Sequence, residues 1–302
     1  MRATHLLLFP SLLIGCLTGN GGDDSKDTNT GDGGSNRTQD DFIFTKEAYI
    51  GDTTCNGMEQ LPPDAAMQTM STLNGTIQDF QTEDAVKEAS VKVWYGDDIA
   101  GAPDQTTAAD TNGAFTVEVP MCTPLAYGTL TPPEWEETVD TYEVHQVYEY
   151  TDAGSFSQTV NSVSEATAKI IPSIIGVEWD RTTGIIAGTA YDCNEDGIGH
   201  AQVYLHDADG KAPATGDIYY FDDNNFPANH DTFKDANPEN GLWVAINIPS
   251  GTWTAEMWGY NGTDYELLGS TVLQIKAGSV NISNIFTGHD DGIAYPDSCY
   301  PE

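Results

Sequence analysis

The stretch LNGTIQD at residues 73–79 is repeated, with substitutions, as IAGTAYD at residues 186–192, and this pair is the strongest indication of the fold. Both copies keep a glycine, a threonine and an aspartate, and both alternate apolar with other side chains around them. Alternation with a period of two predicts a strand that buries one face. Since the two copies lie in different halves of the chain, we expect an internal repeat.

The repeat extends beyond these two strands. A second alternating run follows each copy at nearly the same distance, ASVKV at 89–93 and AQVYL at 201–205. A third pair is NGAFTVEVP at 112–120 and NGLWVAINIP at 240–249, and its Asn-Gly start indicates a tight turn because both residues tolerate positive φ. The sequence therefore predicts two copies of one antiparallel module.

The order of these motifs resembles that of carboxypeptidase regulatory-like domains. ADTNGAF at 109–115 and IPSGTWT at 248–254 match the family pattern closely. The first copy departs from it at PMCTP, residues 120–124, and the second has an enlarged loop at 219–238. The resemblance implies an all-β fold of two tandem transthyretin-like (prealbumin-like) antiparallel β-sandwiches. These are packing and turn motifs, so they specify fold better than function.

We expect the first sandwich to span residues 71–183 and the second residues 184–302. Residues 42–70 are irregular and are predicted to form an N-terminal extension packed on the first sandwich. The stretch EATAKII at 165–171 predicts a short helix that ends near Pro172.

The first residues predict export and lipidation. Residues 1–15 have a positive start and a short apolar run, as in a signal peptide, and LIGC at 13–16 resembles a bacterial lipobox. The resemblance implies a lipid on Cys16, with residues 16–41 as an acidic tether rich in Gly, Asp and Asn. Leu17 lacks the aspartate that favours inner-membrane retention, which points to the bacterial outer membrane or cell surface. The alternative is an ordinary secretory signal in which Cys16 is incidental.

The composition excludes some partners. The 302-residue chain has 11 Lys and Arg against 47 Asp and Glu, a formal net charge of -36. Such a charge repels nucleic acid and anionic lipid headgroups, so we expect no nucleic-acid partner. Because hydrophobic residues still make up 39% of the chain, it is predicted to be globular rather than disordered.

Four cysteines remain besides Cys16, and an even number in an exported protein predicts two disulfides. Pairing Cys55 with Cys122 and Cys193 with Cys299 keeps each bridge within one half, and we predict that pairing. A zinc site is the alternative, but no two of the four have Cys-x-x-Cys spacing.

The one candidate metal site begins at DCNEDG, residues 192–197. Asp192, Asn194 and Asp196 offer oxygen ligands at alternate positions, as in a calcium loop. Val203 occupies the position where an EF-hand needs a glutamate, so a distant carboxylate such as Asp207 would have to complete the site. The alternative is a plain Asx turn between two strands. We therefore expect no cofactor, with Ca²⁺ as the alternative.

Catalytic motifs are not evident, and we expect no enzyme. The sequence lacks Gly-x-Ser-x-Gly, His-Glu-x-x-His and Gly-x-x-x-x-Gly-Lys patterns. His200 and His206 share a strand face, but six residues of extended chain separate them by about 20 Å. Intradiol dioxygenases use a similar sandwich, yet their closely spaced His-x-His pair is missing.

Aromatic residues suggest carbohydrate binding as an alternative function. By alternation, Trp94 and Tyr204 are predicted to point away from the core, and Trp258 lies near a loop, so all three could stack on sugar rings. The competing interpretation is that they cover a second sheet or a domain interface.

These observations predict a non-enzymatic cell-envelope lipoprotein that acts as a surface-exposed binding or structural module. A carbohydrate-binding module and a calcium-stabilised adhesin component are the alternatives. The expected partners are a membrane, through the lipid anchor, and a glycan or envelope protein.

Overall fold

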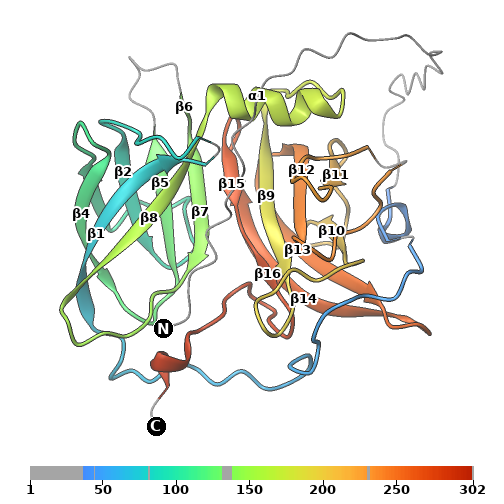
Figure 1. Ribbon diagram of the computed structural model, residues 1–302, viewed down its shortest axis with the longest axis horizontal. Helices are drawn as coiled ribbons and strands as arrows, with labels where there is room; N and C mark the ends of the chain where they lie inside the picture. Colours follow the sequence, from blue (N-terminus) through green and yellow to red (C-terminus); the bar gives the residue numbers. More distant parts are fainter. Residues whose placement is uncertain (1–36, 44, 81, 131–137, 230–231, 301–302) are drawn as a thin grey trace.

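The protein is all-β, as predicted. The computed structural model describes residues 37–43, 45–80, 82–130, 138–229 and 232–300. The first half contains β1 (Met70–Asp79), β2 (Ser90–Tyr95), β3 (Gln105–Ala108), β4 (Ala114–Pro120), β5 (Leu125–Leu130), β6 (Thr138–Val139), β7 (Thr141–Gln146) and β8 (Ser155–Ser164), followed by helix α1 (Glu165–Ile174) (Figure 1). The second half contains β9 (Thr183–Tyr191), β10 (Gln202–His206), β11 (Asp217–Tyr220), β12 (Leu242–Pro249), β13 (Gly251–Tyr260), β14 (Tyr265–Ile275), β15 (Val280–Ile282) and β16 (Ile285–Phe286). Two 3-10 turns, η1 (Gln39–Asp41) and η2 (Asp297–Cys299), lie near the ends.

The two halves share one sheet. Its nine strands include the order β11-β12-β9-β15-β7-β5-β2-β3, with β16 added to β9. The short strand β15 lies between β9 and β7 and runs parallel to both. The predicted boundary between residues 183 and 184 falls at the start of β9, and strands from both sides of it combine in this sheet (Figure 1).

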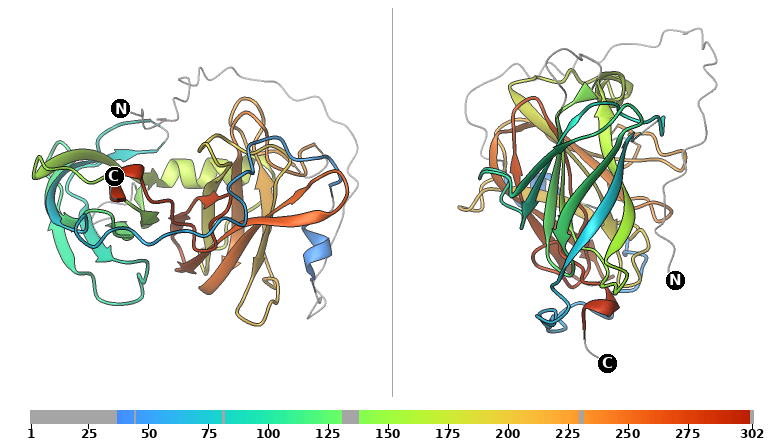
Figure 2. Two further views of the ribbon diagram at one scale, coloured as in Figure 1. Left: turned by 90° about the horizontal axis from the view of Figure 1, so that it is seen from below. Right: turned by 90° about the vertical axis from the view of Figure 1, so that its left-hand side faces the viewer.

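Two smaller sheets cover opposite faces of the shared sheet. The four-stranded sheet β4-β1-β8-β6 and helix α1 lie on one face, which we call the helix side. Ala168 of α1 packs there against Ile185 and Val244. The three-stranded sheet β10-β13-β14 covers the other face, the β14 side, where Trp243 packs with Met257. Each half is thus a sandwich, and the sandwiches are joined edge to edge (Figure 2).

The repeated glycine makes room for the repeated aromatic residue. Gly75 of β1 pairs with Phe115 of β4, and Gly188 of β9 pairs with Trp243 of β12. A Cβ atom on Gly75 would lie 2.1 Å from a ring carbon of Phe115. On Gly188 it would lie 3.2 Å from the indole nitrogen of Trp243 and 1.8 Å from the carbonyl oxygen of Ser283. The sequence repeat is therefore a structural repeat, fixed by a glycine and its cross-strand aromatic neighbour.

The N-terminal extension lies on the second half, so the prediction that it packs on the first sandwich is wrong. Phe42 is buried in the β14-side core with Tyr204, their ring centroids 5.6 Å apart. Further along, the N–H of Ile50 donates to the carbonyl of Gly199 over 3.0 Å, and the reverse bond is 2.8 Å long. Figure 2 shows this blue segment running along the second half before the chain reaches β1.

The disulfides also differ from the predicted pairing, which is wrong. Cys55 is bonded to Cys193, and Cys122 is bonded to Cys299. The physical reason is the course of the two chain ends. The extension carries Cys55 to the second half, and the last residues carry Cys299 back to the first half. Each bridge thus closes a loop of well over 100 residues, 138 and 177 apart in sequence.

The predicted helix is present and slightly longer than expected. Its N-cap Ser164 accepts the backbone N–H of Thr167 over 3.1 Å, which fixes the start directly after β8. It ends at Ile174, with Pro172 in its final turn. Among the residues that the structure describes, no helix is long and apolar enough to cross a membrane.

Candidate functional site at the junction of the halves

The two halves meet at strand β7. Its side chains project from both faces of the shared sheet. Tyr142 and Val144 point to the β14-side core, whereas Glu143 points to the helix side and reaches β8. Beyond Glu143 the register with β5 shifts, and His145 has a positive φ of 61°. Such a bulge re-aims a side chain. His145 therefore contacts residues of the β14 side although its parity matches that of Glu143.

His145 is the centre of a buried polar cluster that joins the halves. Its Nδ1 lies 3.0 Å from the hydroxyl of Ser283 and 3.1 Å from that of Thr271, and the two hydroxyls are 3.2 Å apart. Its backbone N–H donates to the carboxylate of Asp97 over 3.2 Å. His145 is 8% exposed, and the two hydroxyl residues are at most 1% exposed. The cluster thus links β7 to β14 and to the segment after β15.

Burial sets the charge states in this cluster. Burial lowers the pKa of His145 to about 4, although the negative charge of Asp291 acts in the opposite direction. Burial likewise raises the pKa of Asp97 to about 6, against the lowering effect of the N–H donated by His145. At neutral pH the imidazole is therefore neutral, and Asp97 is mostly ionised.

The cluster contains the residue types of a Ser-His-Asp triad, but its geometry is that of a structural contact. The hydroxyl of Ser283 is enclosed, since the residue is 1% exposed. The Nε2 atom of His145 lies 3.7 Å from the Asp97 carboxylate, beyond hydrogen-bond distance. A nucleophile has to reach a substrate carbonyl, and this one is covered by protein.

Glu143 occupies the opposite face of the same strand. One carboxylate oxygen accepts the side-chain amide of Asn161 over 2.6 Å, and the other accepts its backbone N–H over 3.2 Å. Next to it, Thr141 accepts the N–H of Val163 over 3.0 Å, and Thr129 donates to the carbonyl of Asn161 over 3.3 Å. Burial raises the pKa of Glu143 to about 7, although both bonds from Asn161 lower it. These side chains take the place of a neighbouring strand along this part of β8.

A groove of about 290 Å³ opens beside Glu143 on the helix side. We call it the junction groove. Residues of β9, β12 and β15 line one part of it, which we call the floor, and residues of β8 and of helix α1 line the rest. Apolar side chains such as Ile185, Val244 and Ile282 lie at the floor. Three of its lining residues carry carboxyl groups, Asp79, Glu83 and Glu143, and no lysine, arginine or histidine lines it among the residues that the structure describes.

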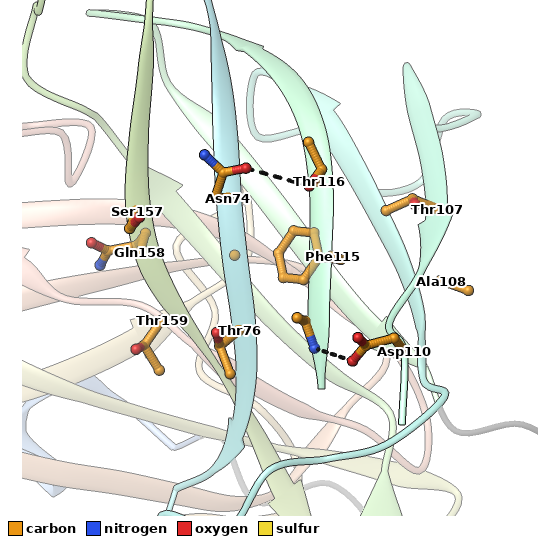
Figure 3. Close-up of a pocket in the computed structure, with 12 residues that line it drawn as sticks. Asn74, Thr76, Thr107, Ala108, Asp110, Phe115, Thr116, Ser157, Gln158 and Thr159 are labelled. Atoms are coloured by element: carbon orange, nitrogen blue, oxygen red, sulfur yellow. Dashed lines mark hydrogen bonds between the residues drawn. The ribbon is translucent and has the colours of Figure 1, made fainter. Parts of the chain in front are cut away.

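A second, wider concavity of about 850 Å³ lies over β1, β4 and β8, and we call it the polar depression (Figure 3). Its outward side chains carry hydroxyl or amide groups, and Thr116 donates to the side-chain oxygen of Asn74 over 3.4 Å. Asp110 is its only charged lining residue in the described part of the chain. The ring of Phe115 is 5% exposed and belongs to the core, so this surface offers hydrogen bonds rather than a stacking face.

The predicted calcium residues form an Asx turn. One oxygen of Asp192 accepts the N–H groups of Asn194 and Asp196, over 2.8 and 3.0 Å, and its other oxygen accepts the N–H of Asp52 over 2.7 Å. Asn194 donates its side-chain amide to Asp52 over 3.2 Å. In the described ranges no group of three or more His, Cys, Asp or Glu residues could hold a metal ion.

The same turn occurs four times in the part of the chain that the structure describes. In each case the aspartate carboxylate accepts the N–H groups two and four residues later, and its own N–H donates to the carbonyl four residues later. The four aspartates are Asp110, Asp192, Asp207 and Asp222. Part of the acidity of the chain therefore comes from a recurrent strand connection.

Two of the three predicted stacking residues are not available to a ligand, so that prediction is wrong for them. Trp94 and Tyr204 are 4% and 6% exposed. The β14-side core covers both because the shared sheet is buried on two faces at the junction, where alternation no longer indicates exposure. Trp258 is partly exposed and donates its indole N–H to Glu256 over 2.9 Å.

The two histidines of β10 and its preceding loop stay apart, each beside its own carboxylate. His200 lies 3.1 Å from Asp235, and His206 lies 3.2 Å from Glu256. Sequence reasoning missed Glu143 and His145. The available signal is that TYEVHQ at 141–146 carries polar residues within a strand that has no exposed face.

Cys16 and most of the predicted tether lie outside the described residues, so the lipidation site stays a prediction. Arg37 is the first described residue, and its guanidinium pairs with Asp217 over 3.3 Å.

Comparisons with known proteins assign no family. No protein-family model matches the chain, and no curated protein matches it. Similar solved structures include the TIE protein of Bacillus anthracis, with 14% identity, 72% of this chain and 34% of that chain covered, and a TM-score of 0.25. They also include the shaft pilin SpaA of Lactobacillus rhamnosus GG, with 11% identity, 75% and 99% covered, and a TM-score of 0.23. The chain spans about a third of the TIE protein. TM-scores of this size assign neither fold nor function.

Proposed function

We propose that this protein is a lipid-anchored, non-enzymatic module of a bacterial cell envelope that presents a rigid binding or structural platform. The observation that supports this most is the joining of both halves by one shared sheet and two disulfides of long sequence separation. A rigid joint holds surfaces of both sandwiches in a fixed relation, as a binding or structural component requires. The enclosed His145 cluster is consistent with this role, because its polar groups hold the halves together.

Oxidative cross-linking of both chain ends suits an exported protein, since disulfides persist outside the reducing cytosol. The lipobox-like sequence before Cys16 supplies the anchor, and the acidic Gly-rich residues after it supply the spacer.

Metabolic labelling with a palmitate analogue tests the anchor. We expect label in the wild-type chain and none in Cys16→Ala, together with release of the variant from the membrane fraction. Equal labelling of both proteins, or equal retention, would remove the lipoprotein assignment. Protease treatment of intact cells then tests which face of the envelope the module occupies, and cleavage within the tether is the expected result.

Neutral glycan is a second candidate partner because of the polar depression. Its hydroxyl and amide side chains match the hydrogen bonding of sugars. Because Asp110 is the only charged residue that lines it in the described part of the chain, the surface offers a charged ligand no opposite charges and suits a neutral one. Retention on immobilised neutral polysaccharides, lost in Asn74→Leu and kept in Trp258→Ala, would support this role, and no retention would remove it.

A further inference from the structure

The two halves differ at one equivalent strand edge. β8 pairs with β1 in parallel, and β15 pairs with β9 in parallel. Ser155 lies opposite Thr72, three residues before Gly75, and Val280 lies opposite Ile185, three residues before Gly188. Residues Ser155 to Ser157 of the first half therefore correspond to Val280–Ile282 of the second.

In the second half this edge is filled. The residues of β15 pair on their other side with β7, from Val280 opposite Thr141 to Ile282 opposite Glu143, again in parallel. In the first half, within the residues that the structure describes, β8 pairs only with β1 and, at its last two residues, with β6. The edge that is covered in one half is thus open in the other.

The open part of the edge can be located to individual residues. In a parallel pair, alternate residues direct their N–H and C=O groups to opposite sides. The carbonyl of Ser162 accepts the N–H of Phe80, the residue directly after β1. Asn161 and Val163 direct their N–H groups to Glu143 and Thr141. By the same alternation, Ser155, Ser157 and Thr159 direct theirs away from β1, where no strand lies among the described segments.

We propose that the junction groove and the open edge of β8 bind an extended, basic polypeptide segment of another protein, which adds as a parallel strand to Ser155–Thr159. This names the partner of the proposed binding role and rests on that role. The main chain of the segment would bond the edge, and its alternate side chains would enter the groove beside β8.

Charge indicates which segment fits. The carboxyl residues lining the groove are Asp79, Glu83 and Glu143, of which Glu143, with its pKa raised to about 7, is about half protonated at neutral pH, and no lysine or arginine lines it in the described chain. An acidic lining with an apolar floor favours a strand that alternates β-branched residues with lysine or arginine. A second copy of this chain fits poorly, because 47 acidic against 11 basic residues would place two strongly negative surfaces in contact.

The test uses the full-length protein in detergent and a phage-displayed library of random twelve-residue peptides. We expect selection of sequences that alternate β-branched and basic residues. A synthetic peptide of the selected sequence should protect the amides of residues 155–159 from hydrogen exchange. Its counterpart with glutamate in place of each basic residue should bind at least about tenfold more weakly.

A matched pair of variants separates main-chain pairing from other contacts. Ser157→Pro removes the N–H that points into the open edge, and proline is tolerated on edge strands. Ser157→Ala keeps that N–H. We expect Ser157→Pro to weaken peptide binding at least about tenfold and Ser157→Ala to leave it unchanged, with both variants folded by circular dichroism.

Ala187→Leu is a second test, because Ala187 belongs to β9 and its larger replacement would fill the groove floor. Ala108→Leu is the control, at an exposed position of β3. Loss of binding only in Ala187→Leu supports the site. No selected peptide, equal binding by the two Ser157 variants, or self-association that Ser157→Pro abolishes would each overturn the proposal. Because these measurements use purified protein, the outcome of the Cys16 labelling is independent of them.

Discussion

Glu143 and His145 stand two residues apart on one strand, yet the two sides of the junction that they occupy differ. On the β14 side His145 is 8% exposed, borders a small pocket of about 190 Å³, and contacts hydroxyls of the second half that are at most 1% exposed, so we call this the closed side. On the helix side the carboxylate of Glu143 is bonded by Asn161 and borders the junction groove. A single β-bulge separates a contact that holds the halves together from a surface that can receive a ligand.

The largest expected effect on stability comes from removing His145 from the buried cluster on the closed side. His145→Ala removes the imidazole between Ser283 and Thr271 and places alanine at a φ of 61°, so we expect a loss of about 3 to 4 kcal/mol of unfolding free energy. Chemical denaturation measures it. His145→Asn is the control, since asparagine tolerates this conformation and can hydrogen-bond. An equal loss in both variants would show that the positive φ does not contribute.

The two sides should respond to pH in opposite directions. The folded pKa of Glu143, about 7, exceeds its ordinary 4.5, so its contribution to stability is full below about pH 4.5 and is lost as pH rises through 7. The folded pKa of His145, about 4, is below 6.5, so its contribution is lost as pH falls from 6.5 towards 4.

We therefore expect the stability difference between Glu143→Gln and wild type to grow by about 2 to 3 kcal/mol in favour of the variant between pH 5 and pH 7. Urea denaturation at several pH values measures this difference. A difference that is independent of pH would contradict the burial of an ionisable group at this position.

A smaller effect tests whether the closed side acts as a unit. A double-mutant cycle of Thr271→Val and Ser283→Ala should give a coupling energy of about 1 to 2 kcal/mol, because both hydroxyls share the imidazole. The same cycle between Thr271 and Thr141, on opposite sides, should give a coupling near zero. Similar values for both cycles would mean that the two sides are not separate.

The smallest expected effect is at the Asx turn of Asp192, which touches neither side. Asp192→Ala leaves three backbone N–H groups without their acceptor, so we expect a loss of about 1 kcal/mol, additive with that of His145→Ala. Thermal melts with and without millimolar Ca²⁺ measure it. A calcium-dependent rise in melting temperature that the variant abolishes would restore the calcium alternative.

Local sequence patterns predicted many of the strands, the turns and the helix. The alternation around Gly75 and Gly188, the Asn-Gly turns and the short helix after β8 are all determined by neighbours in the sequence, and the strands and helix appear where they are predicted. The repeated glycine was visible too, although its reason is a cross-strand aromatic residue. The periodicity of a strand indicates only whether its two faces differ in burial. It does not indicate which strands pair with its two edges.

The all-β class, the repeat, the even set of cysteines and the acidity of the chain can all be predicted from the sequence, because each depends on composition or on spacing within a few residues. The pairing of β7 with β15, the bond between Cys55 and Cys193 and the burial of Trp94 depend on the three-dimensional packing. These contacts join residues far apart in the chain, so which edges and faces meet depends on how two complete sandwiches pack. The same packing leaves Ser155–Thr159 of β8 with no second neighbouring strand among the residues that the structure describes.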